Sequence, residues 1–314
     1  MSVEGDPIPP LLLTHVAITG SLGPSIAVLR GAELLAFDVF VQDATGQPAE
    51  AAILARDDAS LTLMPALIRG VRNMPALVIG DGGVHRINDL SVSSVVNDAP
   101  DAAAVRVLGP ANITRAQIRA DVATGVRVEP SPEDRPSFNE LFIKGTETGL
   151  AVAGPLLIFD LSVEGAEAAA VRVLEGASGV IFRTRISDSH RGVVSEGGEL
   201  DILQMVSEGA RRSAVLVEGG MLGVSNARLN HGEQGVRVEG GALVLDGAAI
   251  QNNAAGVVVT GGQADLSNVI VRRNRVGLAA AAGVAPEHFN VVSRDNQVDE
   301  TACTPPCTQL TDLP

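Results

Sequence analysis

The sequence predicts an all-β solenoid of about twelve coils of about 21–27 residues, whose strands stack into three parallel sheets. A repeat of about 21 residues runs through the second half, where VRVEGGALVLDGAAIQNNAAG from Val236 is followed by VVVTGGQADLSNVIVRRNRVG from Val257. Each repeat alternates apolar and polar residues in three short pieces, which is typical of strands. Hydrophobic residues make up 46% of the chain, yet Trp and Tyr are absent. Small aliphatic side chains suit the repeated, nearly constant core volume of a solenoid.

The repeat continues backward through the first half, where the coils lengthen to about 25 residues. The coils are expected to begin near Ile26, Ala52, Leu77, Val105, Val126, Leu150, Val171, Val193, Val215, Val236, Val257 and Leu278. No change in composition divides the chain. We therefore expect one solenoid domain over residues 11–298, between an N-terminal tail of residues 1–10 and a C-terminal tail of residues 299–314.

Three short strands are expected within each coil. In the coil that starts at Val236 they cover residues 236–238, 243–245 and 248–250. Asn226, Gly247 and Asn268 occupy one column between the second and third strands. Because Asn and Gly tolerate a left-handed backbone, a sharp bend is expected there in successive coils. Each strand then pairs in parallel with its equivalent one coil away, at about 4.8 Å along the axis.

Two other repeat architectures and a local helical signal compete with this prediction. The L-x-x-L-x-L-x-x-N framework of leucine-rich repeats is absent, and so is the six-residue subperiod of left-handed hexapeptide helices. The alanine-rich runs Ala102–Leu108 and Ala166–Leu174 have helical propensity. In the register of the repeat, however, Val171 and Val173 match the first-strand valines of neighbouring coils, so strands are expected in both runs.

The recurring pattern is G-V-x-V-x-G-G, an alternating strand, an Asn bend, another strand and N-x-x-x-G. It resembles the right-handed parallel β-helix superfamily, which includes pectate lyases and many surface repeat proteins. The resemblance is strongest from Val193 to Val298 and looser from Ile26 to Gly192. It implies a right-handed β-helix. Members include polysaccharide lyases and hydrolases, epimerases, phage tailspikes and adhesins, and no catalytic motif of the enzymes matches here, so the resemblance implies no single activity.

Charge and terminal composition bound the partners and the compartment. A net charge of −14 argues against a nucleic-acid partner, and no apolar run is long enough to span a bilayer. The N-terminus carries Glu4 and Asp6 where a secretory signal has positive charge. We expect an extracellular or cell-surface protein from which an upstream segment has been removed. An uncapped first coil also predicts self-association, which polar residues in place of Leu12 and Val16 would prevent.

Both cysteines, Cys303 and Cys307, lie in the segment CTPPC near the C-terminus. Their spacing is not that of a C-x-x-C metal or redox motif. A disulfide that closes the turn at Pro305 and Pro306 is expected, which implies an oxidising compartment. Free thiols are the alternative.

Charged residues recur on the outward side of the first strands, which forms the usual groove in the families that the repeat resembles. The outward second position carries Arg106, Arg127, Arg172 and Arg237, and the outward fourth position carries Glu129, Glu196, Glu218 and Glu239. Parallel stacking would place Glu196, Glu218 and Glu239 about 4.8 Å apart, where they repel unless cations or arginines intervene. One interpretation is a shallow groove that binds Ca²⁺, or a uronic-acid or other sugar chain. The other is a solvated face that keeps the solenoid soluble.

A second acidic group, Asp57, Asp58 and Asp81, falls at the first turns of adjacent early coils, with His85 and Arg86 nearby. Carboxylates beside a basic residue suit proton abstraction or acid–base hydrolysis, but Asp81-Gly82-Gly83 also reads as an ordinary turn. The sequence favours a non-catalytic structural or carbohydrate-binding module, with no catalytic or metal-binding residue assigned, and a polysaccharide or another surface protein as partner. The alternative is a polysaccharide lyase or glycoside hydrolase that uses Asp57, Asp81 and Arg106 on the outer face of the first sheet.

Overall fold

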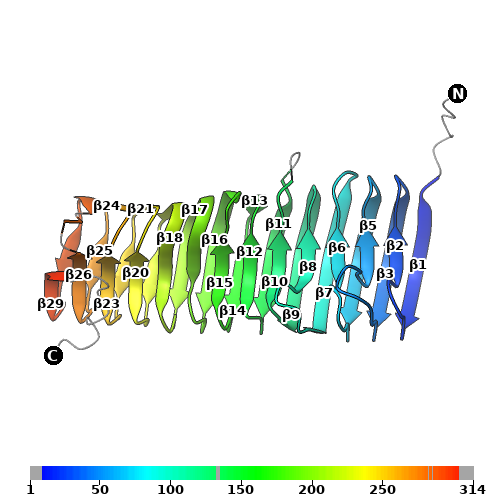
Figure 1. The fold of residues 1–314 in the computed structure, drawn as a ribbon, viewed down its shortest axis with the longest axis horizontal. Helices are drawn as coiled ribbons and strands as arrows, with labels where there is room; N and C mark the ends of the chain where they lie inside the picture. The colour runs from blue at the N-terminus through cyan, green and yellow to red at the C-terminus, as the bar shows by residue number, and fades with distance from the viewer. Residues whose placement is uncertain (1–8, 132–134, 282, 285, 304–314) are drawn as a thin grey trace, which may run out of the picture.

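The computed structural model describes residues 9–131, 135–281, 283–284 and 286–303. Without any helix, these residues form a parallel β-solenoid of about 13 turns, which confirms the predicted fold class. The strands stand side by side along the long axis, from the blue N-terminal coils to the red C-terminal coils (Figure 1). None of the described residues belongs to an apolar helix of membrane-spanning length.

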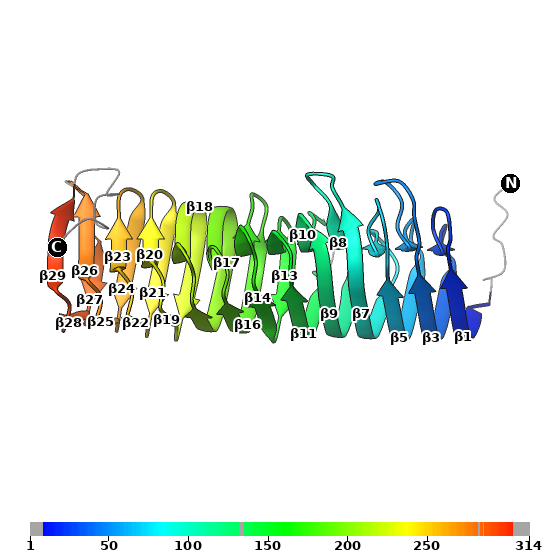
Figure 2. The ribbon, with the colours of Figure 1, turned by 90° about the horizontal axis from the view of Figure 1, so that it is seen from below.

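Each coil contributes strands to three parallel sheets, which the long strands join at the bends into one continuous 29-stranded sheet. The stacking of the coils is visible from a second direction in Figure 2. The first sheet contains β2 (Ile26–Val28), β4 (Ile53–Ala55), β6 (Leu77–Ile79), β8 (Ala103–Val107), β10 (Thr124–Val128), β12 (Thr148–Val152), β15 (Ala169–Val173), the first parts of β17 (Val193–Glu208) and β18 (Ser213–Ser225), β20 (Gln234–Val238), β23 (Ala255–Val259), β26 (Val276–Ala281) and β29 (Val298–Cys303).

The second and third sheets share their longest strands, because a single bend carries the chain from one sheet to the next. The shared strands are β1 (Leu11–Thr19), β3 (Glu33–Gln42), β5 (Ser60–Arg69), β7 (His85–Asn97), β9 (Ala111–Val122), β11 (Ser137–Lys144), β16 (Ser178–Ser187) and the later part of β17. Five segments lie only in the second sheet: β13 (Pro155–Ile158), the end of β18, β21 (Ala242–Asp246), β24 (Gln263–Ser267) and β27 (Glu287–Phe289). Five strands lie only in the third sheet: β14 (Leu161–Glu164), β19 (Arg228–Asn230), β22 (Ala249–Gln251), β25 (Ile270–Arg272) and β28 (Val292–Arg294).

The strand register confirms the predicted coil starts with one exception. All ten starts from Leu77 to Leu278 lie in a single column of paired residues in the first sheet. The exception is Ala52, because its neighbour Ile53 is the residue that pairs with Ile26 and Leu77. At the other end, β29 pairs with β26 and continues the first sheet past residue 298, where the tail was expected to begin.

Two local predictions are also confirmed. The alanine-rich runs form the strands β8 and β15 rather than helices. Asn226, Gly247 and Asn268 have φ angles of 55°, 66° and 54°, so the left-handed bend recurs between the second and third sheets. In both cases the repeat was a better guide than single-residue propensity, since each strand is stabilised by pairing with its neighbours along the stack.

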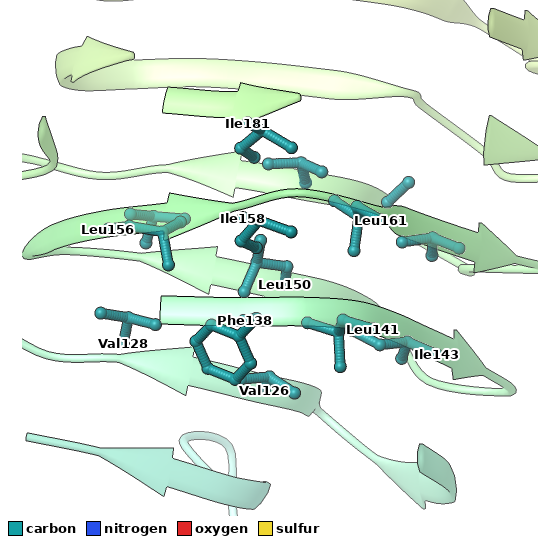
Figure 3. Packing of buried hydrophobic residues seen from close by; sticks show 14 of the residues in the cluster. Val126, Val128, Phe138, Leu141, Ile143, Leu150, Leu156, Ile158, Leu161 and Ile181 are labelled. Carbon is teal, nitrogen blue, oxygen red and sulfur yellow. The ribbon is translucent and has the colours of Figure 1, made fainter. Parts of the chain in front are cut away.

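The core is one continuous cluster of Val, Leu, Ile and Ala side chains along the solenoid, with Phe138 as its largest member. In Figure 3, buried side chains from successive coils fill the space between the sheets. At the N-terminal end, β3 is the one strand among the described residues that pairs with β1, and Leu11 and Leu12 are 59% and 60% exposed. Self-association through this coil stays a prediction. Cys307 lies outside the described residues, and the side chain of Cys303 is not described either, so the predicted disulfide is untested.

Candidate functional site

The four predicted arginines lie in one row on the outer face of the first sheet. Arg127 pairs with Arg106 in the neighbouring coil, whereas Arg172 neighbours Ala151, and Arg237 neighbours Leu216. Between the arginines, the same row carries the apolar residues Ala151, Val194 and Leu216, all of which are buried. The register was therefore predicted correctly, but the row alternates between charged and apolar stretches.

The arginines of this row form ion pairs with the predicted glutamates. Arg172 donates from Nε and Nη2 to the two carboxylate oxygens of Glu196, at 2.6 and 2.9 Å. The Nε of Arg106 donates to Glu129 at 2.7 Å. Within one coil, the Nε of Arg237 donates to Glu239 at 2.5 Å. Such charge-assisted hydrogen bonds hold both partners in a fixed geometry.

The glutamates on this face stack less regularly from coil to coil than the sequence predicted. A bulge between β17 and β18 places Glu196 opposite Gly219 instead of opposite Glu218. The hydrogen bonds that Arg172 donates to Glu196, together with the negative charges of Glu196, Glu218 and Glu147, raise the pKa of Arg172. The repulsion expected among the carboxylates is thus offset by arginines of the same face, which fits a solvated, internally paired surface.

In the second acidic group, Asp57 and Asp58 lie at the first turn of one coil, and Asp81 lies at the corresponding turn of the next coil. Asp57 and Asp58 both have a φ of 60°, and Gly82 approaches so closely that a Cβ there would lie 2.0 Å from Asp58 Oδ1. Arg56 lies 3.7 Å from Asp57. Aspartates with a left-handed backbone, packed against a glycine of the next coil, are typical of ordinary turns. Among the described residues, no three His, Cys, Asp or Glu side chains are grouped to hold a metal ion.

His85, expected beside these aspartates, instead points into the core from the start of β7. It is only 1% exposed and is stacked between Leu61 and Ala111 of the neighbouring coils. Its Nε2 lies 3.1 Å from the carbonyl oxygen of Gly82 and donates to it. The other ring nitrogen, Nδ1, has no partner among the described residues. Burial lowers the pKa of His85, because the charged imidazolium loses its hydration there.

This lowered pKa makes the stability of the fold sensitive to acid. In the unfolded chain His85 takes up a proton near pH 6.5, but the folded chain resists protonation until a lower pH. Above about pH 6.5, His85 is neutral in both the folded and the unfolded chain and does not lower the stability of the fold. As the pH decreases below this value, proton uptake by the unfolded chain lowers the stability. We expect the melting temperature of His85→Leu to fall less than that of the parent between pH 7.5 and 5. His288→Leu, an exposed control, should follow the parent, and equal acid sensitivity in all three proteins would contradict the prediction.

A third feature, which the sequence did not reveal as a site, lies at the bend between the second and third sheets. We call this the second bend. Left-handed residues with φ between 51° and 66° occupy it in nearly every coil: His15, Asp38, Asp89, Arg115, Glu140, Arg183, Gln204, Asn226, Gly247, Asn268 and Asn290. Their side chains face outward, and in the middle coils they are charged. A non-glycine residue in this conformation is uncommon, so the closed coil imposes the bend on residues that do not favour it.

A groove with a volume of about 820 Å³ follows the second bend through the middle coils. Bend residues from Asp89 to Gln204 line it together with the outward residues of the third sheet, Ser91, Gln117, Phe142, Ser162 and Arg185. Arg115 donates to both carboxylate oxygens of Asp89, at 2.5 and 2.6 Å, and Arg183 donates to Asp160 at 2.6 Å. The wall of this groove is therefore a ladder of paired guanidinium and carboxylate groups.

Phenylalanines gather beside the second bend. Six of the seven in the chain are not fully buried, and all six lie within two residues of this bend: Phe37, Phe40, Phe142, Phe159, Phe182 and Phe289. Phe159 and Phe182 stack with their ring centroids 5.4 Å apart. The guanidinium of Arg119 lies 5.9 Å from the ring centroid of Phe142, at the groove. Phe recurs at this place in the repeat, but only the stacked coils connect this recurrence with the groove.

No protein-family model matches the chain, and the search of curated proteins found no similar protein. The geometry of its surfaces therefore carries the functional argument.

Proposed function

We propose that this chain is a non-catalytic β-helix module, exported or displayed at the cell surface, that binds a carbohydrate chain in the groove along the second bend. The groove itself is the main support, because it is long and open and is lined by the ring of Phe142 and by paired polar groups. Resemblance of the repeat to the pectate-lyase-like superfamily also favours a carbohydrate ligand.

The lining of the groove suits a polymer that runs parallel to the solenoid axis. Successive coils repeat every 4.8 Å or so, which is close to the length of one sugar ring in an extended chain. Each coil would then meet one sugar unit. The paired arginines and carboxylates provide donors and acceptors for hydroxyl groups, and Phe142 provides an apolar face for the ring carbons.

Charge balance in the groove favours a neutral polysaccharide. Its lining contains three carboxylates, Asp89, Glu140 and Asp160, and three arginines, Arg115, Arg183 and Arg185, so the formal charges cancel. An acidic polymer would gain little here and would be repelled by the net charge of −14 over the whole chain.

Binding is tested by affinity electrophoresis against neutral glucans and mannans and against acidic polygalacturonate. We expect retardation by a neutral polymer and a loss of about tenfold in affinity in Phe142→Ala, as is typical when a central contact residue is truncated. Phe289→Ala, a 74% exposed control outside the groove, should bind like the parent. Failure of every polymer to bind would refute the proposal, and release of reducing ends or unsaturated uronates would show an enzyme instead.

A further inference from the structure

Four basic side chains meet where the third sheet leads back to the first, just before β17 and β18. His190 and Arg191 belong to one coil, and Arg211 and Arg212 belong to the next. Together we call them the basic cluster. Arg211 is exposed, the side chain of Arg212 is 59% exposed, and the other two are partly exposed. A concentration of positive charge is unexpected in a chain with a net charge of −14.

The backbone register brings like charges side by side. The N–H of Arg211 donates to the carbonyl of Ser189 at 3.0 Å, and the N–H of Arg212 donates to the carbonyl of His190 at 2.8 Å. This parallel pairing sets Arg211 beside His190 and Arg212 beside Arg191, about 4.8 Å apart. Like charges held this close together repel each other.

Among the described residues, one acidic group forms an ion pair with the basic cluster. Arg212 lies 3.4 Å from Glu233, which is in the following coil, and Glu167 lies in the preceding one. No ion pair to Arg191 or Arg211 is formed within the part of the chain that the structure describes. Two guanidinium groups thus remain available to an anion from solution.

The pKa of His190 is affected by the positive charges of the basic cluster. Partial burial lowers the pKa of His190, and the charges of Arg191, Arg212 and Arg211 lower it further, while Glu233 opposes them. The positive charges of Arg191, Arg211 and Arg212, which disfavour a proton on His190, favour a negative group beside it.

We propose that the basic cluster binds an oxyanion, either a sulfate or a phosphate group. Guanidinium groups present planar pairs of N–H donors that match the oxygens of such groups, and two of them from adjacent coils enclose one tetrahedral anion. The anion offsets the repulsion between the coils. This site is separate from the groove at the second bend, so anion binding here does not depend on carbohydrate binding there.

The test uses the whole protein and isothermal titration with sodium sulfate at constant ionic strength. We expect saturable binding with one anion per chain and an upward shift of the His190 pKa, followed by its imidazole NMR signals, as sulfate is added. Arg191→Gln/Arg211→Gln should weaken binding about tenfold or more, because it removes the charge-assisted hydrogen bonds. It should also abolish the His190 response. Arg69→Gln/Arg228→Gln makes the same change of charge at exposed positions elsewhere and should behave like the parent.

Non-saturable binding, or equal binding by the two double variants, would overturn the proposal. A titration with dextran sulfate identifies the source of the group. Affinity per sulfate that greatly exceeds that of the free ion would assign the site to sulfated polymers. Equal affinity would assign it to the free anion.

Discussion

Phe138→Ala is expected to destabilise the protein by about 3–5 kcal/mol, the usual cost of removing a buried aromatic side chain from a well-packed core. Phe138 is 1% exposed and lies between Ile113 and Ile158 of the adjacent coils. In Figure 3, Val126, Phe138 and Leu141 are among the buried side chains that fill the space between the sheets. The walls around it are hydrogen-bonded to the coils on both sides, so they cannot collapse fully into the space that alanine leaves.

Urea unfolding followed by far-ultraviolet circular dichroism measures this effect. Phe289→Ala removes the same atoms from a ring that is 74% exposed and should change stability by no more than about 0.5 kcal/mol. Phe138→Leu should recover most of the loss, since the neighbouring positions already hold branched aliphatic residues. A Phe138→Ala variant as stable as Phe289→Ala would contradict the packing that we describe.

Asn274→Ala is expected to have the second largest effect, a loss of about 3 kcal/mol, because buried hydrogen-bonding groups would be left without partners. Asn274 is the middle member of an asparagine ladder inside the last coils. Its Oδ1 accepts from the backbone N–H of Asn253 at 2.9 Å, and its Nδ2 donates to the carbonyl of Ile250 at 3.1 Å and to Asn296 at 3.2 Å. Alanine removes all of these bonds but leaves the buried backbone groups in place.

Asn112→Ala is the matched control, since Asn112 is exposed on β9. Thermal melting of the two variants and the parent should rank Asn274→Ala well below the other two. Exchange of the Asn253 amide hydrogen should also become faster in Asn274→Ala alone. Equal melting temperatures of the two variants would show that the ladder does not stabilise the C-terminal coils.

Several features of the fold could be predicted because they repeat. The in-or-out direction of a side chain is a property of a single strand, so alternating valines identified the core-facing column from Leu77 to Leu278. Gly247 and the asparagines of its column marked the second bend for a similar reason, since Asn and Gly are stable in the left-handed conformation on their own. A lone outlier such as Ala52 arises where insertions make the repeat irregular.

His85 and the second bend of the middle coils were not predictable in this way. A polar residue at the start of a strand carries no signal that it will be enclosed, because enclosure depends on the coils above and below. Arg115, Glu140 and Arg183 do not favour a left-handed backbone, yet they adopt it because the coil must close on its neighbours. The groove that these residues line was therefore invisible until the coils were stacked.

The sequence by itself determined the number and length of the coils to within about one turn, the composition of the core and which outer positions carry charge. Tertiary structure alone decided how those charges meet. Glu196 pairs with Arg172 of the preceding coil instead of stacking on Glu218, because a bulge shifts the register there. The physical reason is that periodicity specifies the direction of each side chain, whereas its partners depend on turn lengths and bulges that place one coil against the next.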